Sequence, residues 1–272
     1  MNCHYINLSF EHEKRHLIEA NFHQFNSKKW VLNRFEAIDK NFVQTNQVKG
    51  QISDGAKGCF LSHRALMNQH IQSDSHLYIV EDDVVFCNKT QHLVEKVTSL
   101  DSMDWDMLYT DVCIPQASQM MTLYQLKQEC TKEDQLRVLD LAQMNFASTA
   151  AYIVNKKSIA KVAALLNAPD ELNIPIDLYY RSLVHSGELK AFVTFPFLTS
   201  LSSRSEDSNI QTAQHAYTEL VWHTFRKLIW INGNENDIND ELTRIKNGTF
   251  ANHQKAMSTI IAGFYSNDYL SK

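Results

Sequence analysis

The sharpest chemical feature of this sequence is the acidic run Glu81-Asp82-Asp83, which directly follows the apolar segment 76–80. Three consecutive carboxylates repel one another, so at the end of a buried strand they need a compensating cation or full hydration. Alternate side chains of an extended segment point the same way, so Glu81 and Asp83 are expected to converge while Asp82 faces away. Hard oxygen ligands suit Mn²⁺ or Mg²⁺. The alternative, on this run alone, is an acidic loop that holds no metal.

A second motif, Gly58-Cys59-Phe60-Leu61-Ser62-His63, opens a predicted helix about twenty residues upstream. Gly58 lacks a Cβ, which allows the backbone to approach a ligand or a neighbouring segment. Ser62 and His63 are typical of hydrolases, but no third triad member follows, and adjacent helical residues face different ways. A structural or ligand-contacting role is therefore favoured over nucleophilic catalysis. Cys59 is interpreted as a small core residue.

The elements that position these motifs alternate between strand and helix. Strands are predicted at 4–8, 31–38, 76–80, 106–110 and 148–154, and helices around 17–25, 58–67, 90–100 and 156–166. This alternation indicates an α/β domain with a largely parallel sheet. The acidic run then lies at the carboxyl end of a strand, where open α/β sheets bind ligands. Loops are expected at 41–54, 115–145 and 200–212, and the last two are long enough to be functional flaps.

The chain is expected to form one domain over 1–212 and a helical C-terminal extension over 213–272 packed on it, with helices at 215–230 and 256–264. Arg226, Lys227 and Trp230 in the extension allow peripheral membrane contact, but simple packing is favoured because basic residues are few.

Charge and cysteine content restrict the function class. The net charge of −5 argues against a general nucleic-acid binder, which would carry a large basic face. We see neither an apolar run long enough for a membrane span nor a signal peptide. The five cysteines are scattered without a C-x-x-C pair, which predicts free thiols in a reducing cytoplasm.

Taken in order, four segments resemble the glycosyltransferases of family 25. These are the strand Tyr5–Leu8, the segment Arg34–Asp39 (R-F-E-A-I-D), the G-C-x-x-S-H motif and the E-D-D run. That family includes bacterial lipooligosaccharide and lipopolysaccharide β-galactosyltransferases and relatives that glycosylate collagen hydroxylysine. The resemblance is strong over about residues 5–85 and loose over 145–185.

The resemblance implies a GT-A-like fold with a Rossmann-like, mostly parallel sheet flanked by helices. The nucleotide sugar would bind to the half formed by about residues 1–112, and the acceptor to the half formed by about residues 113–212. Asp83 and Glu81 would hold Mn²⁺ or Mg²⁺ against the diphosphate of a UDP-sugar. Residues expected to contact the donor are Asn7, Arg15, Asp39, Gly58, Ser62, His63, Glu81 and Asp82. Three have structural alternatives: Asn7 as a strand-end polar residue, Arg15 as a solvated helix residue, and Asp39 as a turn-starting residue.

Inversion at the sugar, which the family implies, requires a general base for the acceptor hydroxyl. Asp177, in the segment Pro175–Tyr180, is the first candidate and Asp111 the rival; Asp177 could equally be a helix N-cap. The expected reaction moves galactose from UDP-galactose to a lipid-linked saccharide at the cytoplasmic face of the inner membrane. A catalytically silent carbohydrate-binding protein and a Mg²⁺-dependent phosphohydrolase are the alternatives.

Overall fold

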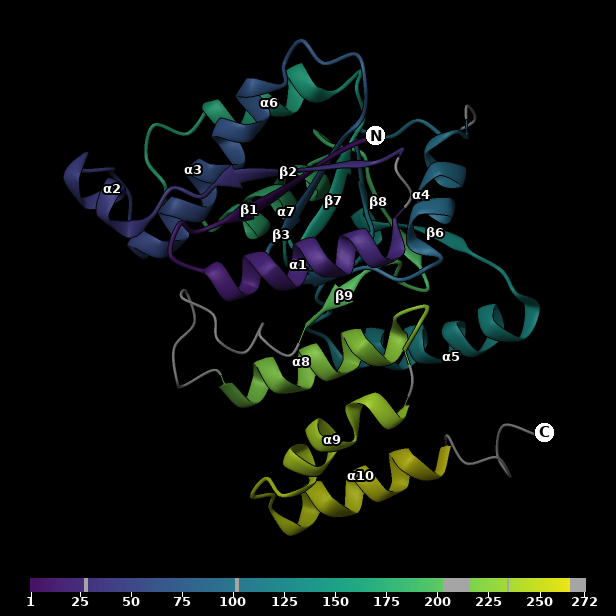
Figure 1. The fold of residues 1–272 in the computed structure, drawn as a ribbon. Coiled ribbons are helices and arrows are strands. Elements are labelled where there is room, and N and C mark those ends of the chain that lie inside the picture. Colours follow the sequence, from purple (N-terminus) through teal and green to yellow (C-terminus); the bar gives the residue numbers. More distant parts are fainter. Residues whose placement is uncertain (27–28, 101–102, 203–215, 234, 265–272) are drawn as a thin grey trace.

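Among the described residues, a seven-stranded sheet forms the centre of the molecule and helices cover both of its faces (Figure 1). The computed structural model describes residues 1–26, 29–100, 103–202, 216–233 and 235–264. Two short strands, β4 (Val84–Val85) and β9 (Ser200–Leu201), pair with each other. The strands of the main sheet are β1 (Asn2–Asn7), β2 (Val31–Glu36), β3 (Leu77–Glu81), β5 (Met107–Tyr109), β6 (Arg137–Asp140), β7 (Ala151–Val154) and β8 (Ala191–Phe195).

The sheet has the strand order β2-β1-β3-β7-β5-β8-β6. Strands β1, β2, β3, β5 and β8 run in one direction, whereas β7 and β6 are antiparallel to their neighbours. The predicted α/β class with a mostly parallel sheet is therefore confirmed, with two reversed strands. Because β7 is reversed, its first residues lie beside the end of β3, and the Glu81 backbone N–H donates to the Ala150 carbonyl at 2.7 Å.

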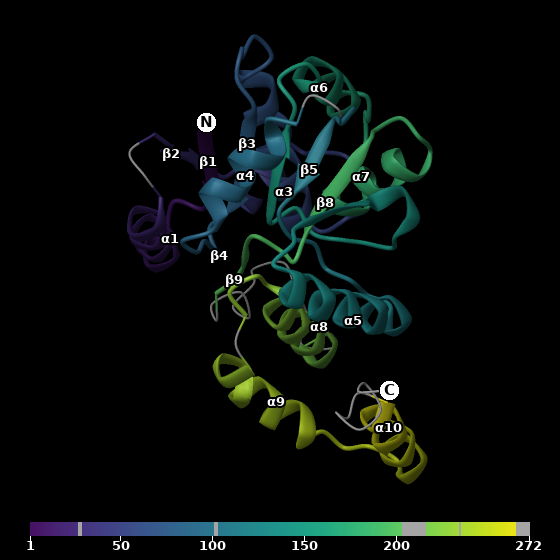
Figure 2. The ribbon, with the colours of Figure 1, turned by 90° about the vertical axis from the view of Figure 1, so that its right-hand side faces the viewer.

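The described α-helices are α1 (His12–Phe25), α2 (Lys40–Thr45), α3 (Asp54–Gln69), α4 (Thr90–Thr98), α5 (Ala117–Glu133), α6 (Ile159–Asn167), α7 (Ile176–His185), α8 (Ala216–Ile229), α9 (Asn239–Lys246) and α10 (Asn252–Phe264). Helices α3, α6 and α7 pack on one face of the sheet and α1 and α4 on the other, whereas α9 and α10 lie away from it (Figure 2).

Strand β3 is buried on both faces, as its unbroken apolar sequence requires. Leu77 and Ile79 belong to the cluster that contains the buried side chains of α3, α6 and α7. Tyr78 and Val80 belong to the cluster that contains those of α1 and α4. This alternation fixes the strand on both sides, so that Glu81 emerges at a rigid edge.

All three predicted loops contain regular structure, because β9 (Ser200–Leu201) lies at the start of 200–212 and helices lie in the other two. In 41–54, α2 is capped by Asp39, whose Oδ1 accepts from the Phe42 N–H at 2.8 Å. Helix α3 begins at Asp54, before Gly58, because Ser53 caps it by accepting from the Ala56 N–H. Short polar helices of this kind are specified by their caps more than by apolar periodicity.

The predicted loop 115–145 was also wrong, because it holds α5 and β6. Leu123 and Cys130 are the buried residues of this seventeen-residue helix, which leaves it polar over most of its surface. Too few apolar positions remain for the helical period to stand out. Residues 203–212 of the other predicted flap lie outside the described part of the chain.

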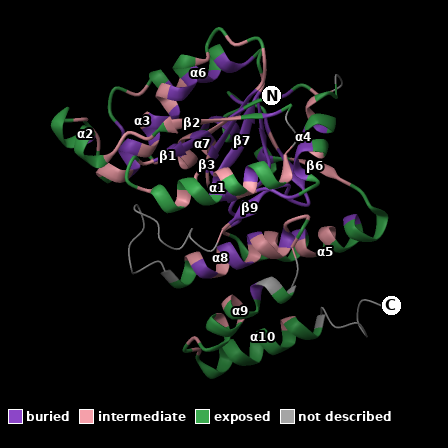
Figure 3. Cartoon of the chain, in the orientation of Figure 1, coloured by how far each residue is buried: buried purple, intermediate pink, exposed green. Residues whose placement is uncertain are grey.

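The C-terminal helices differ in how closely they pack on the sheet. The predicted helix at 215–230 corresponds to α8, whose Ile229 belongs to the main core, and the helix at 256–264 corresponds to α10. Figure 3 shows that α9 and α10 are mainly exposed, whereas α8 is partly buried. Among the described helices, none has the length and apolar character that crossing a bilayer requires.

Candidate functional site

Two cavities meet at the acidic run. The first cavity, of about 210 Å³, is lined by the end of β1, the first turn of α1, the β2–α2 connection, α3 and Glu81–Asp83. The second cavity, of about 240 Å³, is lined by α3, the segment before β7, the start of α7 and the inner face of α8. Cys59, Glu81 and Asp83 line both cavities. Ligands in the two cavities would therefore face each other across these three side chains.

Glu81 and Asp83 ionise differently although they lie two residues apart. Burial opposes ionisation of Glu81, but His63, Thr149 and Arg226 outweigh it, so its pKa is lowered. The Thr149 hydroxyl donates to Glu81 Oε1 at 2.8 Å. Burial, followed by the charges of Glu81 and Asp82, raises the pKa of Asp83 to about 7. Neighbouring carboxylates that titrate apart in this way mark a site that favours an added cation.

Asp83 fits a divalent cation best. Its Oδ1 is buried and has no hydrogen-bond partner among the described residues. A buried, unpartnered carboxylate oxygen is costly unless a cation completes it. Together with the Glu81 carboxylate it offers the hard oxygen donors that Mn²⁺ and Mg²⁺ prefer.

Asp82 lies apart from this pair. Its Oδ2 accepts from Asn7 Nδ2 at 2.7 Å, and Arg34 Nε donates to Asn7 Oδ1 at 3.0 Å. Burial raises the pKa of Asp82, although the Asn7 hydrogen bond opposes the shift. Asn7 and Arg34 thus join β1 and β2 to the acidic run, and Asp82 lines the first cavity only.

The positive charges near Asp83 come from two distant parts of the chain. Lys14, in the first turn of α1, and Arg226, in α8, both favour the ionised form of Asp83. Lys14 lines the first cavity. The predicted Arg15 lines neither cavity; it is 45% exposed and pairs with Glu19 one turn away. The sequence interpretation therefore missed Lys14 by one position in the helical phase.

The G-C-x-x-S-H motif joins α3 to the β2–α2 connection. A Cβ at Gly58 would lie 2.4 Å from the Ile38 carbonyl oxygen, so only glycine permits this approach. The Ser62 hydroxyl accepts from the Ile38 N–H at 2.8 Å and donates to the Gly58 carbonyl at 2.7 Å. Gly58 lines neither cavity, whereas Ser62 lines the first one, with its hydroxyl proton donated to the Gly58 carbonyl. Both residues therefore have a structural role, and a contact between Ser62 and the ligand of the first cavity stays a prediction.

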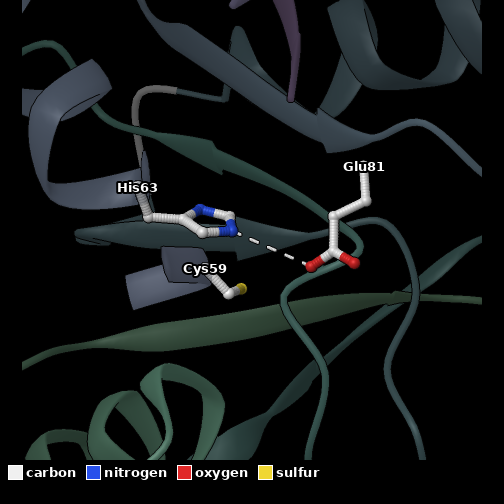
Figure 4. Close-up of side chains that lie close together, drawn as sticks. All are labelled: Cys59, His63 and Glu81. Carbon is white, nitrogen blue, oxygen red and sulfur yellow. Dashed lines mark ion pairs between the residues drawn. The ribbon is translucent and has the colours of Figure 1, made fainter. Parts of the chain in front are cut away.

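Cys59 and His63 are the other half of this motif and project from α3 toward Glu81 (Figure 4). His63 Nδ1 lies 2.7 Å from the Tyr152 hydroxyl, and His63 Nε2 lies 3.8 Å from Glu81 Oε1. Both side chains line the first cavity, and Cys59 also lines the second. Cys59 is thus more than a core residue, which the sequence alone did not indicate.

Asp177 lies in the second cavity, whereas its rival Asp111 lines neither. Pro175 occupies the N-cap position of α7, so Asp177 is a first-turn residue and not the cap. Its Oδ2 accepts from the Ser148 N–H at 3.1 Å. Ser148 has φ of +85°, a backbone conformation that non-glycine residues rarely adopt and that is common at functional sites.

Asp111 instead forms a buried ion pair with Arg226. Arg226 Nη2 donates to Asp111 Oδ2 at 2.6 Å and to Ser148 Oγ at 3.3 Å. Burial raises the pKa of Asp111, although the guanidinium favours its ionised form. Arg226 is 2% exposed and lines the second cavity, so it is not a membrane contact. Lys227 pairs with Glu241, so both cations of α8 are engaged within the protein.

Asp39 lines the first cavity and caps α2 through the hydrogen bond given above. The turn-starting alternative is therefore confirmed. Its second oxygen, Oδ2, lies 3.3 Å from Asn41 Nδ2, and a role toward the ligand of the first cavity stays a prediction.

Comparison with known proteins gives a family and distant structural neighbours. The model of Glycosyltransferase family 25 (LPS biosynthesis protein) matches residues 1–180. No curated protein matches the chain in sequence.

Solved structures resemble the chain only distantly. The apo-form glycosyltransferase GlyE of Streptococcus pneumoniae TIGR4 is 6% identical with a TM-score of 0.39, over 70% of this chain and 44% of that one. Apo mouse xyloside xylosyltransferase 1 is 12% identical with a TM-score of 0.33, over 70% and 63%. The inositol-1-phosphate CTP transferase of T. maritima is 12% identical with a TM-score of 0.33, over 92% and 98%. The matched region is thus less than two thirds of the first two proteins.

Proposed function

Because this chain belongs to glycosyltransferase family 25, we propose that it transfers a hexose from a nucleotide sugar to a saccharide acceptor. The proposed acceptor is a terminal sugar of lipooligosaccharide or lipopolysaccharide, lipid-linked at the cytoplasmic face of the inner membrane. The proposed donor is UDP-galactose and the product linkage is β, as the motif resemblance implies. The reaction then inverts the configuration at the anomeric carbon.

One observation carries the proposal: two cavities share Glu81 and Asp83, and Asp83 has a buried oxygen to which no residue in the described part of the chain hydrogen-bonds. We assign the nucleotide sugar to the first cavity and the acceptor to the second. Asp83 and Glu81 would hold Mn²⁺ or Mg²⁺, which neutralises the charge that develops on the departing diphosphate. Lys14 adds positive charge on the nucleotide side of these carboxylates.

Asp177 is the proposed general base. Its Oδ2 is oriented by the Ser148 N–H, and its carboxylate lines the second cavity. In the proposed step the acceptor oxygen attacks the anomeric carbon, its proton passes to Asp177, and the bond from that carbon to the UDP oxygen breaks. The electron pair of that bond leaves with UDP, so no protonated leaving group is needed. The Asp111–Arg226 pair holds α8 against the acceptor side.

The test is release of UDP from UDP-galactose, and from other UDP-hexoses, with Mn²⁺ and a panel of saccharide acceptors. We expect acceptor-dependent release that falls by about 10²-fold in Asp83→Asn, comparable to loss of a transition-state charge stabiliser. Asp74→Asn, at an exposed loop position, is the matched control and is expected to retain activity. Release of inorganic phosphate without an acceptor would instead identify a phosphohydrolase. Stable binding of the saccharides without any turnover would identify a binding protein.

A further inference from the structure

Cys59, His63 and Glu81 form a compact group of potential metal ligands inside the site. Cys59 and His63 lie one helical turn apart on α3, so their side chains share a face. The Cys59 Sγ, a His63 ring nitrogen and a Glu81 carboxylate oxygen all lie within 4.8 Å of one another. Figure 4 shows the thiol and the imidazole projecting toward the Glu81 carboxylate.

His63 supplies an independent observation. Its side chain is completely buried, and Nε2 has no hydrogen-bond partner among the described residues. The 3.8 Å from Nε2 to Glu81 Oε1 is too long for a hydrogen bond. Nδ1 is meanwhile fixed by the Tyr152 hydroxyl at 2.7 Å. An imidazole held through one nitrogen and presenting the other is the usual arrangement of a metal-ligating histidine.

We propose that Cys59, His63 and Glu81 bind Zn²⁺, or a similar thiophilic divalent metal, at a site that overlaps the Mn²⁺ or Mg²⁺ site of the transferase. Binding replaces the Cys59 S–H bond by an S–Zn bond and releases the proton to solvent. Because Glu81 belongs to both sites, Zn²⁺ inhibits transfer; this inhibitory consequence rests on the proposed function.

The donor set favours zinc over the metals proposed for catalysis. Thiolate and imidazole are ligands that Zn²⁺ prefers, whereas Mn²⁺ and Mg²⁺ prefer oxygen. Bonds of about 2.0 Å from tetrahedral zinc to nitrogen and oxygen place those two atoms roughly 3.3 Å apart. The observed 3.8 Å between His63 Nε2 and Glu81 Oε1 requires only a small closure. Cys59 and Glu81 line both cavities, which leaves room for water as a fourth ligand.

The test uses Co²⁺ alone as a spectroscopic probe for Zn²⁺, with neither nucleotide nor acceptor present. We expect a thiolate-to-cobalt charge-transfer band in the wild type that added Zn²⁺ abolishes. The band is expected to be absent in Cys59→Ser and to require at least tenfold more Co²⁺ in His63→Gln. Cys113→Ser is the matched thiol control, since Cys113 also lines the second cavity but lies outside the group, and it retains the band.

Asp83→Asn separates this site from the proposed catalytic one. It removes the ligand that is specific to Mn²⁺ and leaves the zinc group intact, so we expect it to retain the cobalt band. A folded wild type without the band, or a band that persists in Cys59→Ser, would overturn the zinc site. This result does not depend on whether the protein is a transferase. If the band is present but Zn²⁺ leaves Mn²⁺-dependent transfer unchanged, the shared use of Glu81 is wrong.

Discussion

The two cavities are built from different kinds of scaffold. The residues that line the first cavity all lie between positions 6 and 83 and come from β1, α1, the β2–α2 connection, α3 and the end of β3. The second combines α3 and the acidic run with the segment 147–150, the start of α7 and residues 219–226 of α8. The sheet edge therefore fixes the first cavity directly, whereas the second also depends on a helix near the end of the chain.

Apart from the shared Glu81 and Asp83, the charged residues of the two cavities also come from different parts of the chain. In the first cavity, Asp82 is held by Asn7, and Lys14 faces the acidic run from α1. In the second, Asp111 and Arg226 form a fully buried pair 115 residues apart in sequence. The family match ends at residue 180, so Arg226 lies beyond it. This contrast indicates that changes in α8 alter the second cavity while the first keeps its shape.

The largest expected effect is a loss of transfer activity, and it distinguishes the proposed acceptor cavity from the proposed donor cavity. Asp177→Asn keeps the Ser148 hydrogen bond available but removes the base, so we expect transfer to fall by about 10²–10⁴-fold. Binding of UDP with Mn²⁺ is expected to be unchanged, because Asp177 lines only the second cavity. Steady-state kinetics and calorimetric titration of the same preparation measure the two quantities. Equal losses in binding and turnover would contradict the division into donor and acceptor sides.

Removing Arg226 tests the dependence of the second cavity on α8. Arg226→Met leaves Asp111 buried without a partner, which costs about 3–5 kcal/mol of unfolding free energy. The double variant Asp111→Leu/Arg226→Met removes both charges and is expected to recover much of that loss. Urea denaturation gives both values. A loss below about 1 kcal/mol in the single variant would show that α8 is not anchored by this pair.

The first cavity is expected to be sensitive to the contact between α3 and Ile38. Gly58→Ala places a methyl group 2.4 Å from the Ile38 carbonyl oxygen, which we expect to cost about 1–3 kcal/mol of unfolding free energy. Gly263→Ala is the matched control, because a Cβ there meets open space. Thermal unfolding compares the two variants. Equal stabilities would mean that the close approach is not required.

The motifs that contribute Asp39, Ser62, His63 and Glu81–Asp83 to the first cavity could be recognised from sequence, because they lie in one stretch of the chain and adjoin recognisable elements. Glu81–Asp83 follow the most apolar strand. A glycine at position 58 indicates that the helix backbone closely approaches another segment there. Arg15 was expected at the site because the family resemblance implies an arginine after the first strand, and which side of α1 faces the cavity depends on helix boundaries that the sequence does not fix. In the second cavity, Arg226 could not be found because its partner is distant in sequence. Helix α5 was missed because it buries few apolar side chains.

A pH dependence of stability is also expected, from one half-buried histidine in β1 and a buried one in α8. Burial, with His70, lowers the pKa of His4 to about 4, and burial, with Arg226 and Lys227, lowers that of His223 to about 4. The unfolded chain binds these protons near pH 6.5 and the folded protein does not. These two histidines are therefore expected to lower the unfolding free energy as the pH drops from about 6.5 to about 4, whereas the raised pKa of Asp83 opposes that fall over the same range.

Substitution identifies the groups responsible. His4→Gln is expected to reduce that slope, whereas His16→Gln, at an exposed position, leaves it nearly unchanged. Denaturant titrations at several pH values give the slopes. A slope unaltered in His4→Gln would assign the effect to other groups.

Binding of the nucleotide at the acidic run is tested most directly by thermal unfolding with UDP, with and without Mn²⁺. Wild-type protein, Asp83→Asn and Asp177→Asn are compared. At ligand about a hundredfold above its dissociation constant, binding adds about 2.7 kcal/mol, which gives a clear shift in Tm. We predict a Mn²⁺-dependent shift in the wild type and in Asp177→Asn, and none in Asp83→Asn. An equal shift in all three proteins, or a shift that does not need Mn²⁺, would contradict a metal-dependent donor site at Glu81 and Asp83.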